Sequence, residues 1–382
     1  MKRIVMLIFV VVMAVGLMTA CGGSSTPSTP ADPPSSPSSD GDTSAPAASG
    51  DLETIIGVVP RTVEVLEDTA FWAAEKMGYF ADRGYTLEMQ QSFGTTDVKM
   101  VATDNADVCF PSPSFVLASI EEGIPIKGIC QYGARNIFGF AVLSDNPIST
   151  WDDLKGHSIA LGDAAWQQIM APDLVAAGLD PDNDVEWVVA GENRFIQVAE
   201  GMIDVLFTWE GEFYQLEAQG FDFIYHSADP IRPCASNPIV ANLDMIDKDP
   251  GKLQAFVRGF QMGLYFVFCS PEASADISLE RFPAIDITWD GAVAVQHGIV
   301  AQNLGSTPAD QALYMNPIGR FYDDKWQMNV DAALAADIIT ASIPLDRIYS
   351  MDFVMGGISD EDKARVEDDA KNYQYAVKDK YQ

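Results

Sequence analysis

Residues 54–59 read TIIGVV, and residues 68–77 read DTAFWAAEKM. The first run is rich in β-branched residues and is closed by Pro60, which is typical of a buried strand. In the second run Phe71, Ala74 and Met77 recur at helical spacing, which predicts a helix. A strand that leads into a helix indicates parallel strands joined by crossover helices.

The same alternation continues outward from this stretch. Further strands are expected at 85–90, 106–110, 126–131, 158–161, 185–189, 203–208 and 221–225. Helices between them are expected at 98–103, 114–122, 166–177, 195–201 and 213–219. Beyond residue 250 the pattern is mainly helical, at 251–269, 271–282, 290–303, 325–336 and 360–378. These patterns predict an α/β fold with two lobes and a helical C-terminal region.

The two α/β runs are separated by Ser144-Asp145-Asn146-Pro147, and the second is closed by the stretch 230–238. We expect residues 53–143 and 238–382 to form the first lobe and residues 144–237 to form the second. The chain would then cross between the lobes twice, and two crossings make a hinge.

The N-terminus indicates export. Lys2 and Arg3 precede the apolar run 4–17, which is too short to span a membrane comfortably. Residues 1–20 are therefore predicted to be a signal peptide. They end in Met-Thr-Ala before Cys21, which resembles the lipobox of bacterial lipoproteins, where the cysteine is lipidated. The alternative is plain secretion with Cys21 as an ordinary thiol.

The segment that follows Cys21 has the composition of a linker. Residues 22–50 contain only Gly, Ser, Thr, Pro, Ala and Asp, and such a segment cannot form a core. We expect residues 21–52 to be a lipidated N-terminus and a disordered tether. The globular body would then be attached to the outer face of the cell membrane, and the host's envelope type stays open.

The charge excludes several functions. The chain has 55 acidic and 23 basic residues and a net charge of −32, so binding to nucleic acid is not expected. Three histidines, at dispersed positions, offer little for a zinc site or a histidine-based catalytic triad. We expect no metal, no cofactor and no catalysis.

Four cysteines remain besides Cys21, and an even number in an exported protein permits two disulfides. Cys109, Cys130 and Cys269 lie in apolar runs, where a free cysteine behaves as a small hydrophobic residue. Free buried thiols are therefore favoured for these and for Cys234, although pairing stays open.

Several motifs resemble the substrate-binding proteins of ABC transporters, in the branch that handles sulfonates, nitrate and thiamine-pyrimidine precursors. The order and spacing of the motifs carry the resemblance, which spans most of residues 54–354. Two positions depart from the family pattern: His157 stands where lysine is usual, and Val205 stands for alanine. The matching segments are AAEKMGYF at 73–80, residues 104–108 followed by EGIPIK at 122–127, ISTWDDLKG at 148–156, EGMIDV at 200–205 and residues 322–354.

This resemblance implies a two-lobed fold of the type II periplasmic-binding-protein kind. It also implies that the protein captures a small molecule and delivers it to a membrane permease with its ATPase. We expect a monomer on the extracytoplasmic face, held at the membrane by its lipid anchor.

The ligand site is expected beyond the carboxyl ends of the strands, against helix N-termini. Turns at that edge carry Gly, Ser, Thr and aromatic side chains, which suit close backbone approach and stacking. The candidate ligand-binding residues are Thr69, Phe71, Trp72, Thr95, Ser112, Tyr132, Asp163, Trp166, Asn193, Trp209 and Glu210.

Three of these candidates are weighed most closely. Trp166 and Trp209 each follow a strand of the second lobe, where an indole can stack on a planar ligand or simply pack at the lobe surface. Glu210 could accept hydrogen bonds from an amino-heterocycle, or it could be a solvated acid at a helix start.

The abundance of aromatic residues favours a planar heterocycle such as a pyrimidine precursor. The alternative ligand is a small anion, a sulfonate, nitrate or carboxylate, because Arg61, Arg135, Arg194 and Arg232 lie at or near predicted turns. A third alternative is an enzyme that resembles the fungal pyrimidine synthases. Their cysteine-rich C-C-C-F-C motif is absent, and residues 110–114 read FPSPS at the corresponding place.

Overall fold

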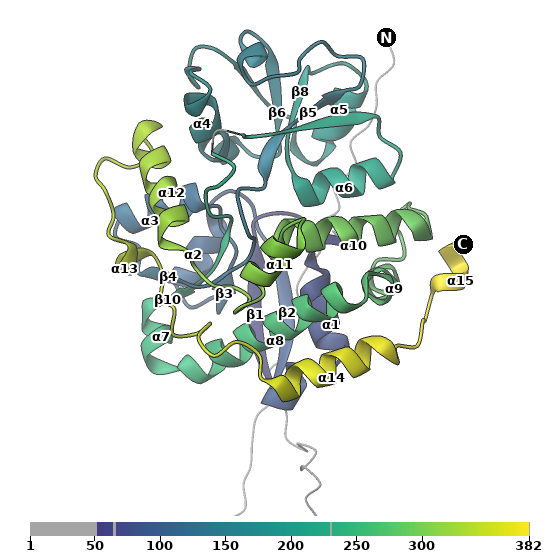
Figure 1. Cartoon of the computed structure of the whole chain (residues 1–382). Coiled ribbons are helices and arrows are strands. Elements are labelled where there is room, and N and C mark those ends of the chain that lie inside the picture. The colour runs from purple at the N-terminus through teal and green to yellow at the C-terminus, as the bar shows by residue number, and fades with distance from the viewer. Residues whose placement is uncertain (1–51, 64–65, 230, 382) are drawn as a thin grey trace, which may run out of the picture. The chain divides into compact units, whose positions relative to one another are not determined.

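The computed structural model describes residues 52–63, 66–229 and 231–381. Two five-stranded sheets with helices packed against them form its framework (Figure 1). We call the part built on the sheet that contains β1 the first lobe and the part built on the other sheet the second lobe. This arrangement confirms the predicted α/β class with two lobes.

The first sheet has the strand order β2-β1-β3-β10-β4. β1 pairs in parallel with β2 and β3, and its Ile55, Val58 and Val59 are almost completely buried. Burial on both faces explains why its sequence is a continuous apolar run. The strands are β1 (Glu53–Val59), β2 (Tyr85–Gln91), β3 (Val108–Cys109), β4 (Ile126–Gln131) and β10 (Pro238–Asn242).

The second sheet has the strand order β7-β6-β8-β5-β9. β6 pairs in parallel with β7 and β8, as the alternating pattern predicts. The strands are β5 (Phe138–Leu143), β6 (Ser158–Leu161), β7 (Glu186–Val189), β8 (Val205–Trp209) and β9 (Phe223–Ser227).

Two strands, β5 and β10, were not predicted from the sequence and depart from the parallel arrangement, and both stand at a crossing between the lobes. β5 is antiparallel to β8 and β9, and β10 is antiparallel to β3 and β4. The chain enters each strand directly from the other lobe without a crossover helix, so the strand runs against its neighbours. The sequence placed residues up to 143 in the first lobe, but Phe138–Leu143 belongs to the second sheet, so the first crossing lies within residues 132–137.

The predicted helices are present, with shifts at their ends. The helix expected over 360–378 ends at Lys371, and the one expected over 213–219 begins earlier, at Glu210. The helices associated with the two sheets are α1 (Thr69–Lys76), α2 (Thr96–Ala102), α3 (Pro113–Glu121), α4 (Gln167–Ala176), α5 (Arg194–Ala199), α6 (Glu210–Ala218) and α7 (Leu243–Lys248). The C-terminal helices are α8 (Pro250–Cys269), α9 (Pro271–Arg281), α10 (Trp289–Leu304), α11 (Pro308–Tyr314), α12 (Asp323–Ala335), α13 (Leu345–Ile348), α14 (Asp360–Lys371) and α15 (Lys378–Tyr381). Among these, the short helices α7, α11, α13 and α15 were not predicted.

The C-terminal helices contact both lobes. α8 packs on α1 so closely that a Cβ at Gly263 would lie 1.9 Å from the carbonyl oxygen of Ala70. α10 packs on α6 of the second lobe, where Gly298 makes room for the ring of Tyr214, and α12 contacts both α3 and α4 (Figure 1). The C-terminal region therefore bridges the lobes instead of belonging to the first lobe alone.

An aromatic core fills the space between α1, α8 and the first sheet. Phe71 of α1 stacks between Phe256, Phe260 and Tyr132, with ring centroids 5.3 to 6.0 Å away. The four cysteines expected to be buried thiols are all free, and Cys109, Cys130 and Cys234 are buried. Apolar packing is therefore what they contribute, as their sequence context predicts.

In the part of the chain that the structure describes, no helix is both long and apolar enough to cross a bilayer. The predicted signal peptide, Cys21 and the tether to residue 51 lie outside the described residues.

Candidate functional site

A cavity of about 620 Å³, part of it open to solvent, lies between the two lobes. It is formed at the carboxyl ends of β1, β3, β4 and β8, which is the edge where the sequence places the ligand. We call it the main cavity. Its lining residues are Val59, Pro60, Arg61, Glu67, Asp68, Phe110, Ser112, Phe115, Tyr132, Ile137, Phe138, Trp166, Ile169, Phe207, Trp209 and Asn237.

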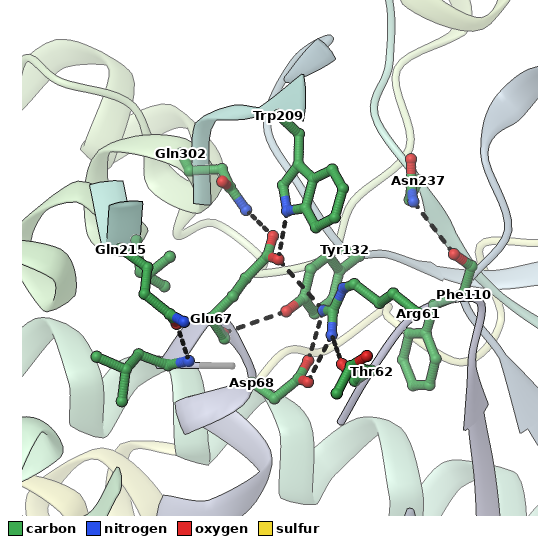
Figure 2. A network of polar contacts seen from close by, with 12 residues as sticks. Arg61, Thr62, Glu67, Asp68, Phe110, Tyr132, Trp209, Gln215, Asn237 and Gln302 are labelled. Atoms are coloured by element: carbon green, nitrogen blue, oxygen red, sulfur yellow. Dashed lines mark hydrogen bonds and ion pairs between the residues drawn. The ribbon is translucent and has the colours of Figure 1, made fainter. Parts of the chain in front are cut away.

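The first-lobe wall is built around a buried charged network (Figure 2). Both terminal nitrogens of Arg61 donate to the carboxylate of Asp68, at 2.7 and 2.8 Å, and Glu67 Oε2 lies 3.3 Å from Arg61 Nη2. Burial opposes the charge of Arg61, yet the carboxylates of Asp68 and Glu67 hold the pKa of its guanidinium above the ordinary value. Arg61 is thus fully occupied by two acids.

Glu67 connects this network to the second lobe and to the C-terminal helices. Its Oε2 accepts a hydrogen bond from Trp209 Nε1 at 2.8 Å, and its Oε1 accepts one from Gln302 Nε2 at 2.6 Å (Figure 2). Burial raises the pKa of the Glu67 carboxyl above 4.5, and the neighbouring Arg61 opposes that rise. Glu67 lies in a short 3-10 helix, Leu66–Asp68. This helix makes a second link to the second lobe, because the Leu66 amide donates to Gln215 Oε1 of α6 at 3.0 Å.

The second-lobe wall is aromatic. The rings of Trp166 and Trp209 meet edge to face with centroids 5.9 Å apart, and Trp166 meets Phe207 in the same way at 6.1 Å. Phe138 stacks on Phe207 at 5.8 Å. Behind them the guanidinium of Arg194 lies 4.9 Å from the ring of Trp166 and pairs with Glu212, so the indole is held from its far side.

Tyr132 and Asn237 complete the first-lobe wall. The Tyr132 hydroxyl donates to the carbonyl oxygen of Glu67 at 3.4 Å, and burial raises the pKa of this phenol well above its ordinary value. Asn237 Nδ2 donates to the carbonyl oxygen of Phe110 at 3.1 Å. Asn237 Oδ1 is buried and has no hydrogen-bond partner among the described residues, so it is an acceptor left for a ligand.

Four of the predicted site residues line the main cavity: Ser112, Tyr132, Trp166 and Trp209. Ser112 caps α3, where its Oγ accepts from the amide of Phe115 at 3.4 Å. The structure brings these four together from the residue before α3, the residue after β4, the residue before α4 and the end of β8. Their contact with a ligand stays a prediction.

Three predicted residues lie at turns but do not line the main cavity. Asp163 Oδ1 accepts a hydrogen bond from the amide of Ala165 at 2.8 Å. A Cβ placed on Gly94 of the first lobe would lie only 3.3 Å from this oxygen, so the turn at Gly94 meets the turn at Asp163 of the second lobe. Thr95 is half-buried beside that contact, and Asn193 is exposed at the end of a short helical turn.

The other predicted residues are turned into the protein. The hydroxyl of Thr69 donates to the carbonyl oxygen of Leu66, and Phe71 lies in the aromatic core. The Trp72 ring lies outside the lining of the main cavity, with the guanidinium carbon of Arg281 3.8 Å from its centroid. Glu210 is buried, where it accepts from Arg135 and Arg232. The reason is geometric: α1 begins at Thr69, so its side chains face the core, and the preceding turn faces the cavity.

Sequence reasoning missed most of the remaining lining. Glu67 and Asp68 lie within the turn between β1 and α1, but as acids before a helix they resembled ordinary helix-start residues. Phe138 and Phe207 lie within strands and not at the turns after strands. Their signal was the aromatic character of β5, which begins at this edge, and of β8, which ends there.

The arginines considered for an anion site are all paired with carboxylates. Arg61 pairs with Asp68, and Arg194 pairs with Glu212. Arg135 and Arg232 share Glu210, at 3.1 and 2.6 Å. Among residues 52–63, 66–229 and 231–381, no group of three or more His, Cys, Asp or Glu side chains is placed to hold a metal ion.

Comparison with known proteins gives a family and a fold. The model of the family described as NMT1/THI5 like matches residues 67–274, just over half of the chain. The riboflavin-binding protein RibY of Chloroflexus aurantiacus is 24% identical to this chain over 297 residues, which cover 75% of this chain and 82% of that protein.

Solved structures with the same fold are mostly substrate-binding proteins. The alkanesulfonate-binding protein SsuA from Xanthomonas axonopodis pv. citri, solved with MOPS, matches with a TM-score of 0.58 at 12% identity, over 80% of this chain and 99% of that chain. The periplasmic nitrate-binding protein NrtA from Synechocystis PCC 6803 matches with a TM-score of 0.58 at 12% identity, over 79% and 87%. An exception is the desulfurization enzyme DSZB, with a TM-score of 0.51 at 16% identity, over 79% and 97%.

Proposed function

Because the chain belongs to the NMT1/THI5-like family and has the fold of ABC-type substrate-binding proteins, we propose that it captures a planar aromatic heterocycle and delivers it to an ABC importer. In this proposal the importer supplies a permease and its ATPase, and the protein itself makes and breaks no bond. The alternative of a pyrimidine-synthase-like enzyme has no specific support from the cavity.

The observation that carries this proposal is the pairing of an aromatic wall with a polar one. Trp166, Phe207 and Trp209 offer apolar ring surface on the second lobe, where a flat ligand gains from stacking and from leaving water. Asn237, on the first-lobe wall, has a buried amide oxygen without a partner in the described chain, which is an acceptor for a ring N–H group. A heterocycle can use both walls at once.

The charge of the first-lobe wall favours a heterocycle over a small anion. Arg61 is the one basic residue among those that line the main cavity, and both Asp68 and Glu67 pair with it. The three side chains together carry more acid than base, so a sulfonate or nitrate would meet no unpaired positive charge. The anion alternative therefore has less support than a neutral ring.

Two heterocycles are the first to test. The relative RibY is described as riboflavin-binding, which makes the isoalloxazine ring a candidate. A pyrimidine precursor is the smaller candidate that the family resemblance implies. The aromatic side chains that line the main cavity offer ring surface on which either heterocycle could stack.

Binding would act on the lobes through contacts that both share with the ligand. A ligand that touches Trp166 of the second lobe and Asn237 of the first favours the closed arrangement by its differential affinity for it. The hydrogen bond between Trp209 and Glu67 joins the two walls directly and would form part of that closed state.

Titration of the purified protein tests the ligand class. Riboflavin, 4-amino-5-hydroxymethyl-2-methylpyrimidine, ethanesulfonate and nitrate should be added separately while tryptophan fluorescence is recorded. We expect a saturable change with a heterocycle, because Trp166 and Trp209 line the cavity. Saturable binding of an anion alone would contradict the proposal. Native mass spectrometry of the freshly purified protein checks for a retained ligand, and a chemically altered product would favour the enzyme alternative.

Anchoring is a separate part of the proposal and rests on the N-terminal sequence. Residues 1–20 would be removed and Cys21 lipidated, so that several acyl chains hold the mature protein at the membrane. The variant Cys21→Ala should move the protein into the soluble fraction of fractionated cells. Continued membrane retention of that variant would contradict the anchor without touching the ligand proposal.

A further inference from the structure

A second cavity adjoins the main cavity at the hinge. It encloses about 370 Å³, part of it open to solvent, and Phe138 and Ile169 line both cavities. Ser112 lines the main cavity, and Ser114, two residues further along the same segment, lines the second. The two cavities therefore lie on opposite sides of the same few side chains. We call the second one the annexe.

The annexe contains a carboxyl group that no cation neutralises. Asp173 of α4 is only 2% exposed, and it forms no ion pair within the described residues. Asn136 Nδ2 donates a hydrogen bond to Asp173 Oδ1 at 3.2 Å. The second carboxyl oxygen, Oδ2, is left without a protein donor in the described chain, although a buried carboxyl ordinarily has several.

The other polar groups of the annexe also leave acceptors unused. Asn329 Nδ2 donates to the carbonyl oxygen of Ala235 at 3.1 Å, which leaves its Oδ1 unbonded in the described part of the molecule. Both polar atoms of the Asn136 side chain are already bonded, because its Nδ2 donates to Asp173 and its Oδ1 accepts from the Phe138 amide at 3.1 Å. The hydroxyl of Ser114 lies on the same lining. A group bound in the annexe could therefore donate hydrogen bonds to Asp173 and Asn329, and it could accept one from the hydroxyl of Ser114.

We infer that the annexe is a subsite for a hydroxyl-bearing chain attached to the heterocycle, which passes between Phe138 and Ile169 from the main cavity. This inference rests on the proposed function, because the ring must occupy the main cavity for its chain to reach the annexe. The hydroxyl groups of such a chain donate hydrogen bonds to the free oxygens of Asp173 and Asn329.

The polar atoms that Asp173 and Asn329 leave free are oxygens that accept hydrogen bonds. The substrate class is thus a flat ring that carries a polyol chain.

Riboflavin and lumiflavin separate the two subsites. They share the isoalloxazine ring, but lumiflavin has a methyl group where riboflavin carries its ribityl chain. We expect riboflavin to bind the wild-type protein at least about tenfold more tightly, as measured by quenching of flavin fluorescence. Asp173→Asn replaces one acceptor by a donor and should reduce that preference to about twofold or less, mainly by weakening riboflavin.

Two further variants keep the test sharp. Ser114→Val removes a hydroxyl from the opposite side of the annexe and fills part of its space, so it should reduce the same preference if Asp173→Asn proves unstable. Asp182→Asn makes the same chemical change at an exposed position of the second lobe outside both cavities, and it should leave the preference as in the wild type.

Each outcome decides one of the two proposals. Equal affinities for riboflavin and lumiflavin in the wild type would overturn the annexe and leave the ring site standing. The same would follow from a riboflavin preference that survives both annexe variants. If neither flavin binds, the main cavity does not take this ring, and the annexe inference fails with it.

Discussion

The two walls of the main cavity hold their side chains in different ways. On the first lobe, Arg61, Glu67 and Asp68 are fixed by charged hydrogen bonds to one another. On the second lobe, Trp166 and Trp209 are fixed by edge-to-face packing and by Arg194 behind them. One wall depends on compensated charge, and the other depends on the shape of apolar rings.

This difference separates stability from binding. A buried ion pair that loses one member leaves an uncompensated charge, which destabilises the fold whether or not a ligand is present. Trp166 and Trp209 carry no such charge: they pack in the core of the second lobe and, because they line the cavity, should also contribute when a ligand covers them. Substitutions in the charged network should therefore act mainly on folding, and substitutions of the two tryptophans should act on affinity as well.

The largest expected effect is from Arg61→Gln. It leaves the buried carboxylates of Glu67 and Asp68 without their cation, so the free energy of unfolding should fall by about 3 to 5 kcal/mol. Urea denaturation followed by circular dichroism measures this. Arg320→Gln, at a position where no carboxylate is paired in the described chain, is the control and should stay close to the wild type. A loss below about 1 kcal/mol for Arg61→Gln would show that the two walls do not differ as described.

A pH effect is expected from Asp97 of α2, a first-lobe carboxyl outside the network. Both of its oxygens are buried without a hydrogen-bond partner in the described chain, and burial raises its pKa from 3.8 to about 7. Between those values the folded protein holds a proton that the unfolded chain has lost, so stability falls as the pH rises. The loss should reach up to about 4 kcal/mol by about pH 8.

The variant Asp97→Asn checks the source of that slope. It cannot ionise, so its unfolding free energy should lose this decline between about pH 4 and about pH 8 when urea denaturation is repeated across the range. Asp346→Asn, at an exposed position, should keep the wild-type slope. A slope that persists unchanged in Asp97→Asn would assign it to another buried carboxyl.

The aromatic wall should respond in affinity. Trp166→Ala and Trp209→Ala should each weaken binding of the heterocycle by about 1 to 3 kcal/mol, since each removes a ring that lines the cavity. Isothermal titration calorimetry with riboflavin measures this. Trp187→Ala removes an indole of the second lobe that lies outside the cavity lining and serves as the control. A double variant that binds as tightly as the wild type would place the pocket elsewhere.

The smallest expected effect is from Asn237→Leu on the first-lobe wall. This change removes the buried Oδ1 that has no partner in the described chain and also the bond to the carbonyl of Phe110. We expect heterocycle affinity to fall by about 0.5 to 1.5 kcal/mol, the usual net value of one hydrogen bond. Unchanged affinity would mean that Asn237 only holds the carbonyl of Phe110, just after β3, and does not contact the ligand.

Much of the fold could be predicted from the sequence because its local signals agree with each other. The run at 54–59 is buried on both faces, and the helix after it starts and ends close to where its periodicity indicates. The strands β5 and β10 could not be placed in the same way. Their direction depends on which lobe the chain has just left, and a local pattern does not contain that information.

The site was predictable only where a strand end exposes a ring. Trp166 and Trp209 were found because they follow strands of the second lobe. Glu67 was missed because its importance comes from partners far along the chain, Trp209 and Gln302, which only the tertiary structure brings to it. Phe71 and Trp72 were chosen for their place in the chain, but helical geometry turns them into the core.

The contact of α10 with α6 has a consequence for the proposed opening of the lobes. A rotation that parted the lobes would also slide α6 along α10, where the Tyr214 ring fills the space beside Gly298. Under this proposal the energy barrier to opening would be set partly by a helix interface outside the lining of the main cavity. How long a bound molecule stays inside would then depend on residues that do not decide which molecule is chosen.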